Sequence, residues 1–314
     1  MVLMKRVVMI AMLICAVLLS GCAAAEQEPA NGAETMRISA VLPHNDYGYW
    51  TIVANGMRDA DKRLPVDVKV QLPDLNYNVS LMTGLIEQEI AAQVDALIVQ
   101  GIEDPDYIAA LEKARAQGIC VVLVDTDLTS FQADLYVGTD NYAAGVEMGK
   151  RLVEVTGGKA NVAVLSGSPG YPNLEERLRG IQDVTASSNG IQILRVEYDQ
   201  YDAMTVMEKY YMICRETPQI DTLTAIEGTG GQTLGQMASV DFEHILVFDD
   251  TEETIQGLRN GVFDGIIGQQ NYEMGVICVE ELYKWFTSGT FTEEKIYTQV
   301  NWITLENLEE TDEG

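Results

Sequence analysis

Short apolar runs alternate with amphipathic stretches from residue 37 onward. Residues 120–124 read Cys-Val-Val-Leu-Val, a continuous apolar run of the kind that a parallel sheet covered on both faces requires. By contrast, Leu81, Leu85, Ile86 and Ile90 stand at helical spacing. The pattern predicts strands over residues 37–42, 66–71, 96–99, 119–124, 161–165, 191–196, 222–226, 244–248 and 265–268. It predicts helices over residues 50–63, 79–93, 107–117, from after 141 to about 156, 174–187, 202–216, near 232, 251–260 and 272–287.

The alternation runs once to residue 139 and restarts after Asp140 and Asn141. Strands that alternate with helices of ten to sixteen residues indicate βαβ units and parallel sheets with helices on both faces. The stretch from Met36 to Leu308 is also longer than one hydrophobic core usually supports. We therefore expect an α/β fold of two doubly wound parallel-sheet lobes.

The N-terminus has the features of a secretion signal. Lys5 and Arg6 precede an uncharged apolar run over residues 7–19, which is shorter than the roughly 20 residues that a membrane-spanning helix needs. The run ends in Leu-Ser-Gly-Cys, with Cys22 last, and this resembles the lipobox of bacterial lipoproteins. We expect a signal peptide over residues 1–21, lipid attachment at Cys22 and a tether over residues 22–35. The alternative is an ordinary secretory signal with a chance cysteine.

Composition and charge narrow the possible partners. The chain is 47% hydrophobic and 22% charged, as in globular proteins, and its net charge of −28 opposes binding to nucleic acids. Cys120, Cys214 and Cys278 lie in apolar or amphipathic runs, so we interpret them as small buried residues. One disulfide with a leftover thiol is the alternative. The spacing suggests no zinc site, and we predict neither a metal nor a cofactor.

Polar and aromatic residues follow the predicted strands, at the sheet edge where open α/β folds bind ligands. Tyr49 and Trp50 offer aromatic faces to a sugar ring, Asp125 and Asp249 can each accept hydroxyl hydrogens, and donors come from Arg177 and Gln269. Such a mixture suits a polyhydroxylated ligand. Structural alternatives exist. The aromatic pair can belong to the core, Asp249 can cap a helix, and Arg177 can pair with Glu175 or Glu176 on the surface.

From about Arg37 to Leu308 the chain resembles the sugar-binding proteins of ABC importers of the ribose- and galactose-binding type. The resemblance rests on short segments in a consistent order, which are Tyr49-Trp50 with Gly56, Val124-Asp125, Val137-Gly138-Thr139-Asp140-Asn141 with Ala144-Gly145, Glu176-Arg177-Leu178-Arg179-Gly180, Val247-Phe248-Asp249 and Gly268-Gln269-Gln270 with Gly275.

The resemblance implies two lobes joined by a three-crossover hinge. Their expected bounds are residues 36–139 plus 270–298 and residues 140–269 plus 299–308, with an acidic tail over residues 309–314. It also implies that Tyr49 and Trp50 stack on the ligand, that Asp125, Arg177, Asp249 and Gln269 bind it, and that Tyr201 adds a further aromatic side chain.

The chain departs from the ribose pattern at three places. Thr126 replaces an arginine, and Glu227 stands where an asparagine is expected, so Glu227 is also a candidate ligand-binding residue. The asparagine before the paired aromatics is ambiguous, because Asn45, Asp46 and Tyr47 compete for it. Compared with the ribose pattern, the predicted site has one basic group fewer and one acidic group more. This difference predicts that the ligand is not ribose, and that it is neutral or cationic rather than anionic.

These observations predict an extracytoplasmic, lipid-anchored solute-binding protein, monomeric, which captures a small polar ligand such as a monosaccharide and delivers it to an ABC importer. Sensing through a membrane receptor or sensor kinase is an alternative, because both functions use ligand-driven closure. A glycosidase that uses Asp125 and Asp249 is a weaker alternative. The chain has only two histidines, His44 and His244, and no recognisable catalytic motif, so we predict that it is not an enzyme.

Overall fold

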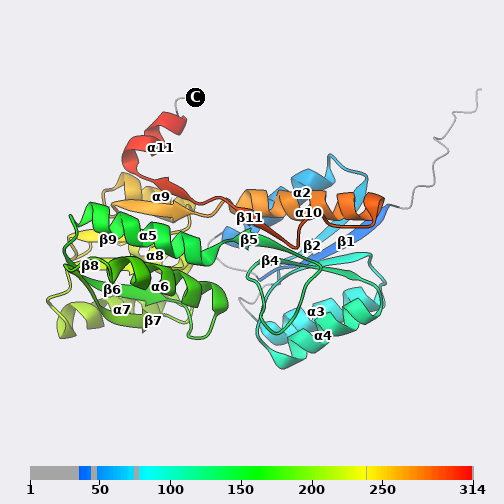
Figure 1. The fold of residues 1–314 in the computed structure, drawn as a ribbon, viewed down its shortest axis with the longest axis horizontal. Coiled ribbons are helices and arrows are strands. Elements are labelled where there is room, and N and C mark those ends of the chain that lie inside the picture. Colours follow the sequence, from blue (N-terminus) through cyan, green and yellow to red (C-terminus); the bar gives the residue numbers. More distant parts are fainter. Residues whose placement is uncertain (1–34, 44–47, 74–77, 238, 313–314) are drawn as a thin grey trace, which may run out of the picture. The chain divides into compact units, whose positions relative to one another are not determined.

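The computed structural model describes residues 35–43, 48–73, 78–237 and 239–312, without the side chains of 309–312. The predicted lipid-attachment residue Cys22 and the residues at positions 44–47 lie outside this part of the chain. The described residues form two lobes, each built on one six-stranded sheet (Figure 1). Within the described part of the chain, no helix combines the length and apolar composition that crossing a bilayer requires.

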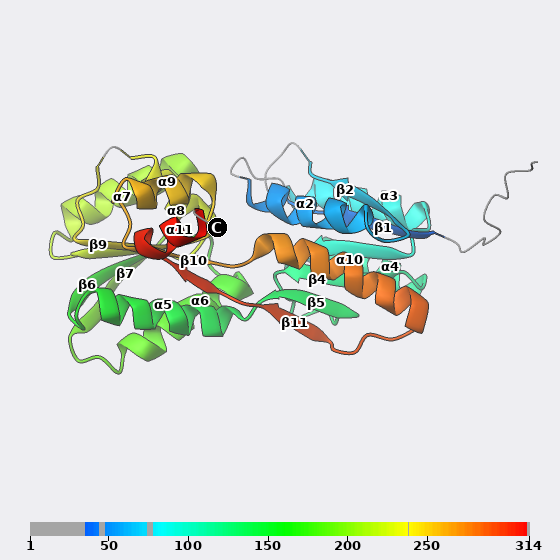
Figure 2. The same ribbon diagram turned by 90° about the horizontal axis from the view of Figure 1, so that it is seen from above.

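The first lobe contains a wholly parallel sheet with the strand order β11-β5-β4-β3-β1-β2. One face carries α2 and α10, and the other carries α3 and α4 (Figures 1 and 2). β3 and β4 are buried along their whole length, as their continuous apolar sequences predict. The bounds are β1 Met36–Val41, α2 Tyr49–Asp61, β2 Val66–Gln71, α3 Val79–Ala91, β3 Ala96–Gln100, α4 Pro105–Ala116, β4 Cys120–Asp125, β5 Leu135–Thr139, α10 Asn271–Ser288 and β11 Lys295–Thr298.

The second lobe repeats this design with the strand order β12-β10-β9-β8-β6-β7. Its pairs are parallel except for β10 with β12. α5 and α6 pack on one face, and α7, α8 and α9 on the other. The bounds are α5 Asn141–Val155, β6 Ala160–Ser166, α6 Pro172–Thr185, β7 Ile191–Tyr198, α7 Ala203–Glu216, β8 Thr222–Ala225, α8 Gly228–Gly235, β9 His244–Phe248, α9 Glu252–Arg259, β10 Gly265–Gly268, β12 Asn301–Ile303 and α11 Leu305–Asp312.

The chain passes between the two sheets three times. It leaves the first sheet after β5, returns to the first lobe between β10 and α10, and leaves it again between β11 and β12. Thr298, at the end of β11, donates from its hydroxyl to the carbonyl oxygen of Gln269, 3.0 Å away, so the second and third crossovers are joined by a hydrogen bond. The doubly wound α/β fold with a three-crossover hinge is thus confirmed.

Glycines let two pairs of helices approach closely. A Cβ added to Gly275 on α10 would lie 2.0 Å from the carbonyl oxygen of Val53 on α2, and one on Gly56 would lie 2.1 Å from that of Tyr272. In the second lobe, a Cβ on Gly145 of α5 would lie 2.1 Å from the carbonyl oxygen of Arg177 on α6. Each lobe therefore contains a helix pair whose spacing excludes any side chain at these positions.

Four elements were absent from the sequence-based expectation, which are β5, β11, β12 and α11. The strand β5 is buried but short, and Gly138 interrupts its apolar run. Strands β11 and β12 have only four and three residues and are partly exposed, so they lack the apolar run by which the longer strands are recognised. Residues 309–312, predicted as part of an acidic tail, belong to α11.

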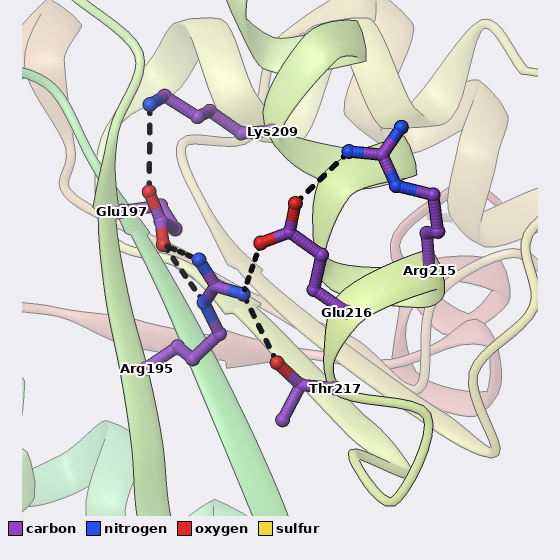
Figure 3. A network of polar contacts seen from close by, with 6 residues as sticks. All are labelled: Arg195, Glu197, Lys209, Arg215, Glu216 and Thr217. Carbon is purple, nitrogen blue, oxygen red and sulfur yellow. Dashed lines mark hydrogen bonds and ion pairs between the residues drawn. The ribbon is translucent and has the colours of Figure 1, made fainter.

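The edge strand β7 carries a network of charged side chains that links it to α7 (Figure 3). Arg195 contacts Glu197 on the same strand at 2.7 Å, and Glu197 also pairs with Lys209 of α7 at 3.4 Å. The guanidinium of Arg195 reaches Glu216 at 3.4 Å and donates to Thr217 at 3.0 Å. Charged side chains on an edge strand also oppose pairing with another sheet.

We expect Arg195→Met to lower the free energy of unfolding by about 1–2 kcal/mol, because Glu197 is largely buried and would retain only Lys209. Denaturant unfolding measures this change. The matched control is Arg215→Met, which removes a mostly exposed arginine that contacts Glu216 in the same network and is expected to change stability by no more than about 0.5 kcal/mol. Equal effects of the two substitutions would contradict the structural role of Arg195.

Candidate functional site

A polar pocket lies where loops and helix starts from both lobes meet. It encloses about 550 Å³ of space that no atom fills, part of it open to solvent. The residues that line it are Tyr49, Trp50, Gln100, Asp125, Tyr171, Asn173, Leu174, Arg177, Tyr201, Glu227, Gly228, Thr229, Asp249 and Gln269.

Two aspartates occupy equivalent places in the two lobes. Asp125 ends β4, the third strand of the first sheet, and Asp249 directly follows β9, the third strand of the second. Their backbone φ angles are 68° and 70°, in the left-handed region that costs free energy for residues other than glycine. Each sheet therefore ends in a strained turn that places one carboxylate at the pocket.

Asp125 acts purely as a hydrogen-bond acceptor. Its Oδ1 accepts from the Tyr49 hydroxyl at 2.7 Å, and its Oδ2 accepts from Gln100 Nε2 at 3.1 Å and from the Thr126 hydroxyl at 2.7 Å. Burial and the charge of Asp125 raise the pKa of Tyr49 well above its ordinary value, so its hydroxyl keeps the proton that it donates. The position where the ribose pattern has an arginine is thus filled by a buried threonine that orients the carboxylate.

Arg177 is 3% exposed and connects several segments of the second lobe. Its Nε donates to Asn141 at 2.9 Å, its Nη1 to the carbonyl oxygen of Ile226 at 2.8 Å, and its Nη2 to Gln269 Oε1. The guanidinium also lies 4.3 Å from the ring centroid of Phe248, a cation–π contact. The alternative that Arg177 pairs with Glu175 or Glu176 on the surface is wrong.

Asp249 is buried beside the hinge glutamine. Gln269 Nε2 donates to its Oδ1, while Gln269 Oε1 accepts from the Thr139 hydroxyl at 2.9 Å. Burial raises the pKa of Asp249 to about 7, although the charge of Arg177 and the Gln269 hydrogen bond oppose the shift. The alternative role of Asp249 as a helix cap is wrong, since the N-cap of α9 is Thr251, whose side chain accepts from Thr254 N.

The aromatic residues stand on two walls of the pocket. Tyr49 and Trp50 are the first two residues of α2. They belong to the hydrophobic core of the first lobe and also line the pocket, so both interpretations of these residues are correct. Their rings meet edge to face, 80° apart, with centroids separated by 5.2 Å, and therefore cannot both stack flat on one sugar face. In the second lobe, Tyr201 and Tyr171 form a similar pair with centroids 5.5 Å apart.

Glu227 lines the pocket and caps α8 with its own carboxylate. Its Oε2 accepts from Thr229 N at 2.8 Å, and its Oε1 accepts from Gly230 N. Asp199 is fully buried and lies close enough to Glu227 to be affected by its charge; its Oδ1 accepts from Tyr201 N, and its Oδ2 has no hydrogen-bond partner among the described residues. Burial, with the charge of Glu227 added, raises the pKa of Asp199 well above its ordinary value. We therefore expect Asp199 to keep its proton at neutral pH.

The Asp199→Asn substitution is expected to flatten the pH dependence of stability. Because the pKa of Asp199 is higher in the folded than in the unfolded state, its stabilising contribution is full below about pH 3.9 and is lost as pH rises towards the folded-state pKa. From pH 6 to pH 8 the wild type should lose up to about 2.7 kcal/mol relative to the variant. Denaturant unfolding at both pH values measures this difference.

The control for this prediction is Asp202→Asn, which changes the exposed N-cap of α7. The pKa of Asp202 is lowered by its hydrogen bonds to Thr205, and asparagine caps helices about as well as aspartate. Its stability relative to the wild type should therefore be the same at pH 6 and pH 8. A similar pH slope in Asp199→Asn and the wild type would show that Asp199 is already ionised at pH 6.

All eight residues predicted to bind ligand line this one pocket. The further lining residues include Gln100, Tyr171, Asn173 and Thr229. Gln100 was identifiable, because it is the last residue of β3 and faces the sheet edge at which ligands bind. Tyr171 and Asn173 stand at the start of α6, and nothing in their local sequence indicates a pocket. Cys120, Cys214 and Cys278 are free thiols, and the described residues contain no cluster suited to a metal ion.

Comparisons with known proteins agree with the fold. The family model of the periplasmic binding protein domain matches residues 38–288. The ribose import binding protein of Bacillus subtilis is 25% identical over 71% of this chain and 72% of its own, and a putative rhizopine-binding protein of Rhizobium meliloti is 25% identical over 88% and 92%. The crystal structure of a glucose-galactose binding protein from Geobacillus stearothermophilus has 28% identity and a TM-score of 0.81 over 88% of this chain and 99% of that one.

Proposed function

Because the chain belongs to the periplasmic binding protein domain family, we propose that it captures a small polyhydroxylated ligand between its two lobes and delivers it to an ABC importer. The main observation in support of this proposal is the pair of aspartates at the ends of β4 and β9. Asp125 comes from the first lobe and Asp249 from the second, and both line the same pocket. The names of its relatives, among them a ribose and a glucose-galactose binding protein, support a monosaccharide or a related polyol.

In the proposed mechanism the ligand acts by shifting the population of the closed form. A ligand that contacts Asp125 and Tyr49 on one lobe and Asp249 and Arg177 on the other makes all of its contacts only when the lobes are closed. It therefore stabilises the closed form by its difference in affinity. The closed surface would then be recognised by the membrane permease. Binding involves no catalytic step, so the ligand should be recovered unchanged.

The N-terminal features complete the proposal. Secretion directed by residues 1–21 and acylation of Cys22 would hold a monomer at the outer face of the cell membrane through the tether that follows. Mass spectrometry of the mature protein tests this point. Diacylglycerol on an N-terminal Cys22 is the expected result, and an unmodified N-terminus elsewhere would contradict it.

Calorimetric titration and thermal-shift screening of the purified protein against pentoses, hexoses, polyols and amino sugars test the function. A ligand present at about 100 times its dissociation constant stabilises the folded protein by about 2.7 kcal/mol, which shifts the melting temperature measurably. A saturable hit with one ligand per chain is expected. The proposal fails if no member of this panel binds.

We expect Asp249→Asn to lower the affinity for the ligand by about 10- to 100-fold, since it replaces charge-assisted hydrogen bonds by neutral ones. The melting temperature of the ligand-free protein should not fall, because asparagine tolerates a positive φ and keeps a similar shape. Calorimetric titration gives the affinity. The control Asp183→Asn alters an exposed aspartate of α6 whose carboxylate accepts from the Tyr142 hydroxyl, and this variant should bind as the wild type does. Equal affinities for both variants would remove Asp249 from the site.

A further inference from the structure

The pocket offers an excess of hydrogen-bond acceptors. Asp125 and Asp249 contribute carboxylates from opposite lobes, and Glu227 adds a third that is already bonded to the start of α8. Arg177 is the one basic residue among the described residues that line the pocket. A ligand that complements this lining must supply donors and positive charge.

The side chain of Gln100 independently indicates that the ligand must donate hydrogen bonds. Its side chain is 3% exposed, and its Nε2 donates to Asp125 Oδ2 and to the Thr126 hydroxyl. The carboxylate fixes the orientation of the amide, since only the NH₂ group can face it. Oε1 is buried, lies in the pocket wall and has no partner. A buried acceptor without a hydrogen-bond partner carries a free-energy penalty. A donor group on the ligand would remove this penalty.

The positive charge of Arg177 is already engaged by the protein. Its Nε, Nη1 and Nη2 each donate to a protein oxygen. The charge of Arg177 also does not keep the pKa of Asp249 at its ordinary value, because burial, together with the charge of Asp125, raises that pKa to about 7. The electrostatics of the pocket therefore favour an additional cation beside the aspartates.

We infer that the ligand is a polyhydroxylated molecule bearing a protonated amine, whose ammonium group donates to Asp125 and to Gln100 Oε1. This inference rests on the proposed function and names its substrate class. A hydroxyl offers one hydrogen, whereas an ammonium offers three and also neutralises charge. The side chains of Asp125 and Gln100 are in direct contact, because the Gln100 amide nitrogen lies 3.1 Å from Asp125 Oδ2. One ammonium can therefore serve both.

Matched sugars that differ at one group test the inference. D-glucose, D-glucosamine and N-acetyl-D-glucosamine, with the corresponding D-galactose series, are titrated calorimetrically into the full chain at pH 6.5. At this pH an amine of α-amino type, with a pKa near 7.7–8.0, is mostly protonated. We expect an amino sugar to bind at least about ten-fold more tightly than both its hydroxyl and its N-acetyl counterpart, from the greater strength of charged hydrogen bonds.

Two variants assign the preference to the named atoms. Asp125→Asn should reduce the ratio of amino-sugar to neutral-sugar affinity to within about two-fold, as the charge is lost while the size is kept. Gln100→Leu, which removes the unpaired acceptor, should lower the affinity for the amine and keeps the test valid if Asp125→Asn fails to fold. The control Asp127→Asn changes an aspartate outside the pocket that pairs with Lys295 at 2.6 Å, and should leave the ratio unchanged.

The outcomes separate the two claims. Tighter binding of a neutral sugar than of its amino counterpart would overturn the amine inference and leave the proposed function in place. An amine preference that survives both Asp125→Asn and Gln100→Leu would overturn the assignment to these residues. If no probe of these series and no member of the wider panel of pentoses, hexoses, polyols and amino sugars binds, the proposed function is overturned, and the inference with it.

Discussion

Replacement of Arg177 by methionine is expected to lower the free energy of unfolding by about 3–5 kcal/mol and to abolish ligand binding. The side chain is buried, and its loss would leave the carbonyl oxygen of Ile226, the side chain of Asn141 and the carboxylate of Asp249 without their cation. Methionine has a similar length but no donor, so burial would be retained while every polar contact is lost. Denaturant unfolding and calorimetric titration measure the two effects.

Arg179→Met is the matched control for this prediction. Arg179 lies on the same helix, is more than half exposed, pairs with Glu176 and stacks on Tyr142. Exposed contacts of these kinds contribute at most about 1 kcal/mol each, and Arg179 does not line the pocket. A loss of less than about 1 kcal/mol in Arg177→Met would mean that water replaces the guanidinium at little cost, and that the site tolerates an uncompensated Asp249.

Gly275→Val is expected to prevent cooperative folding. A Cβ at this position would lie 2.0 Å from the carbonyl oxygen of Val53 and 3.0 Å from Met57 N, and these are backbone atoms of α2 that cannot turn aside. The two helices would have to separate, which would open the core that they share with the first sheet. We expect a loss above about 4 kcal/mol, in the range that is exceptional for single substitutions. Circular dichroism during thermal unfolding measures it.

The chain provides its own control in Gly84, a helical glycine with no atom within 4 Å of its added Cβ. Gly84→Ala should raise stability by about 0.5–1 kcal/mol, because alanine loses less backbone entropy on folding into α3. Adding a Cβ is thus expected to raise the stability of the protein at Gly84 and to lower it at Gly275. A Gly275→Val protein that melts at the wild-type temperature would show that α2 and α10 can separate at little cost.

The sequence alone was sufficient for the class of fold and for the edge of each sheet at which the candidate pocket lies. Continuous apolar runs such as residues 120–124 identify buried parallel strands by composition, and the residues just after them must lie at one edge, as Asp125 and Asp249 do. The short strands β5, β11 and β12 escaped detection because packing and pairing define them. Strands of three or four residues, such as β12 and β11, have too few positions to show a period, and Gly138 interrupts the apolar run of β5. The lobe boundaries and the lipid anchor at Cys22 stay predictions.

Tertiary structure decided what each residue at that edge can do. The charge of Glu227 acts on the buried Asp199, 28 positions earlier in the chain, and the hydrogen bonds of Arg177 to Asn141, Ile226 and Gln269 join three separate segments. The free oxygen of Gln100 exists only because Asp125 turns its amide. The local pattern of apolar and polar residues determines which segments form helices and strands and which of their faces are buried. The protonation state of a side chain, the partners of its donors and the presence of unpaired acceptors depend on which groups, distant in sequence, meet in a site of low dielectric constant. Only the folded chain specifies these neighbours.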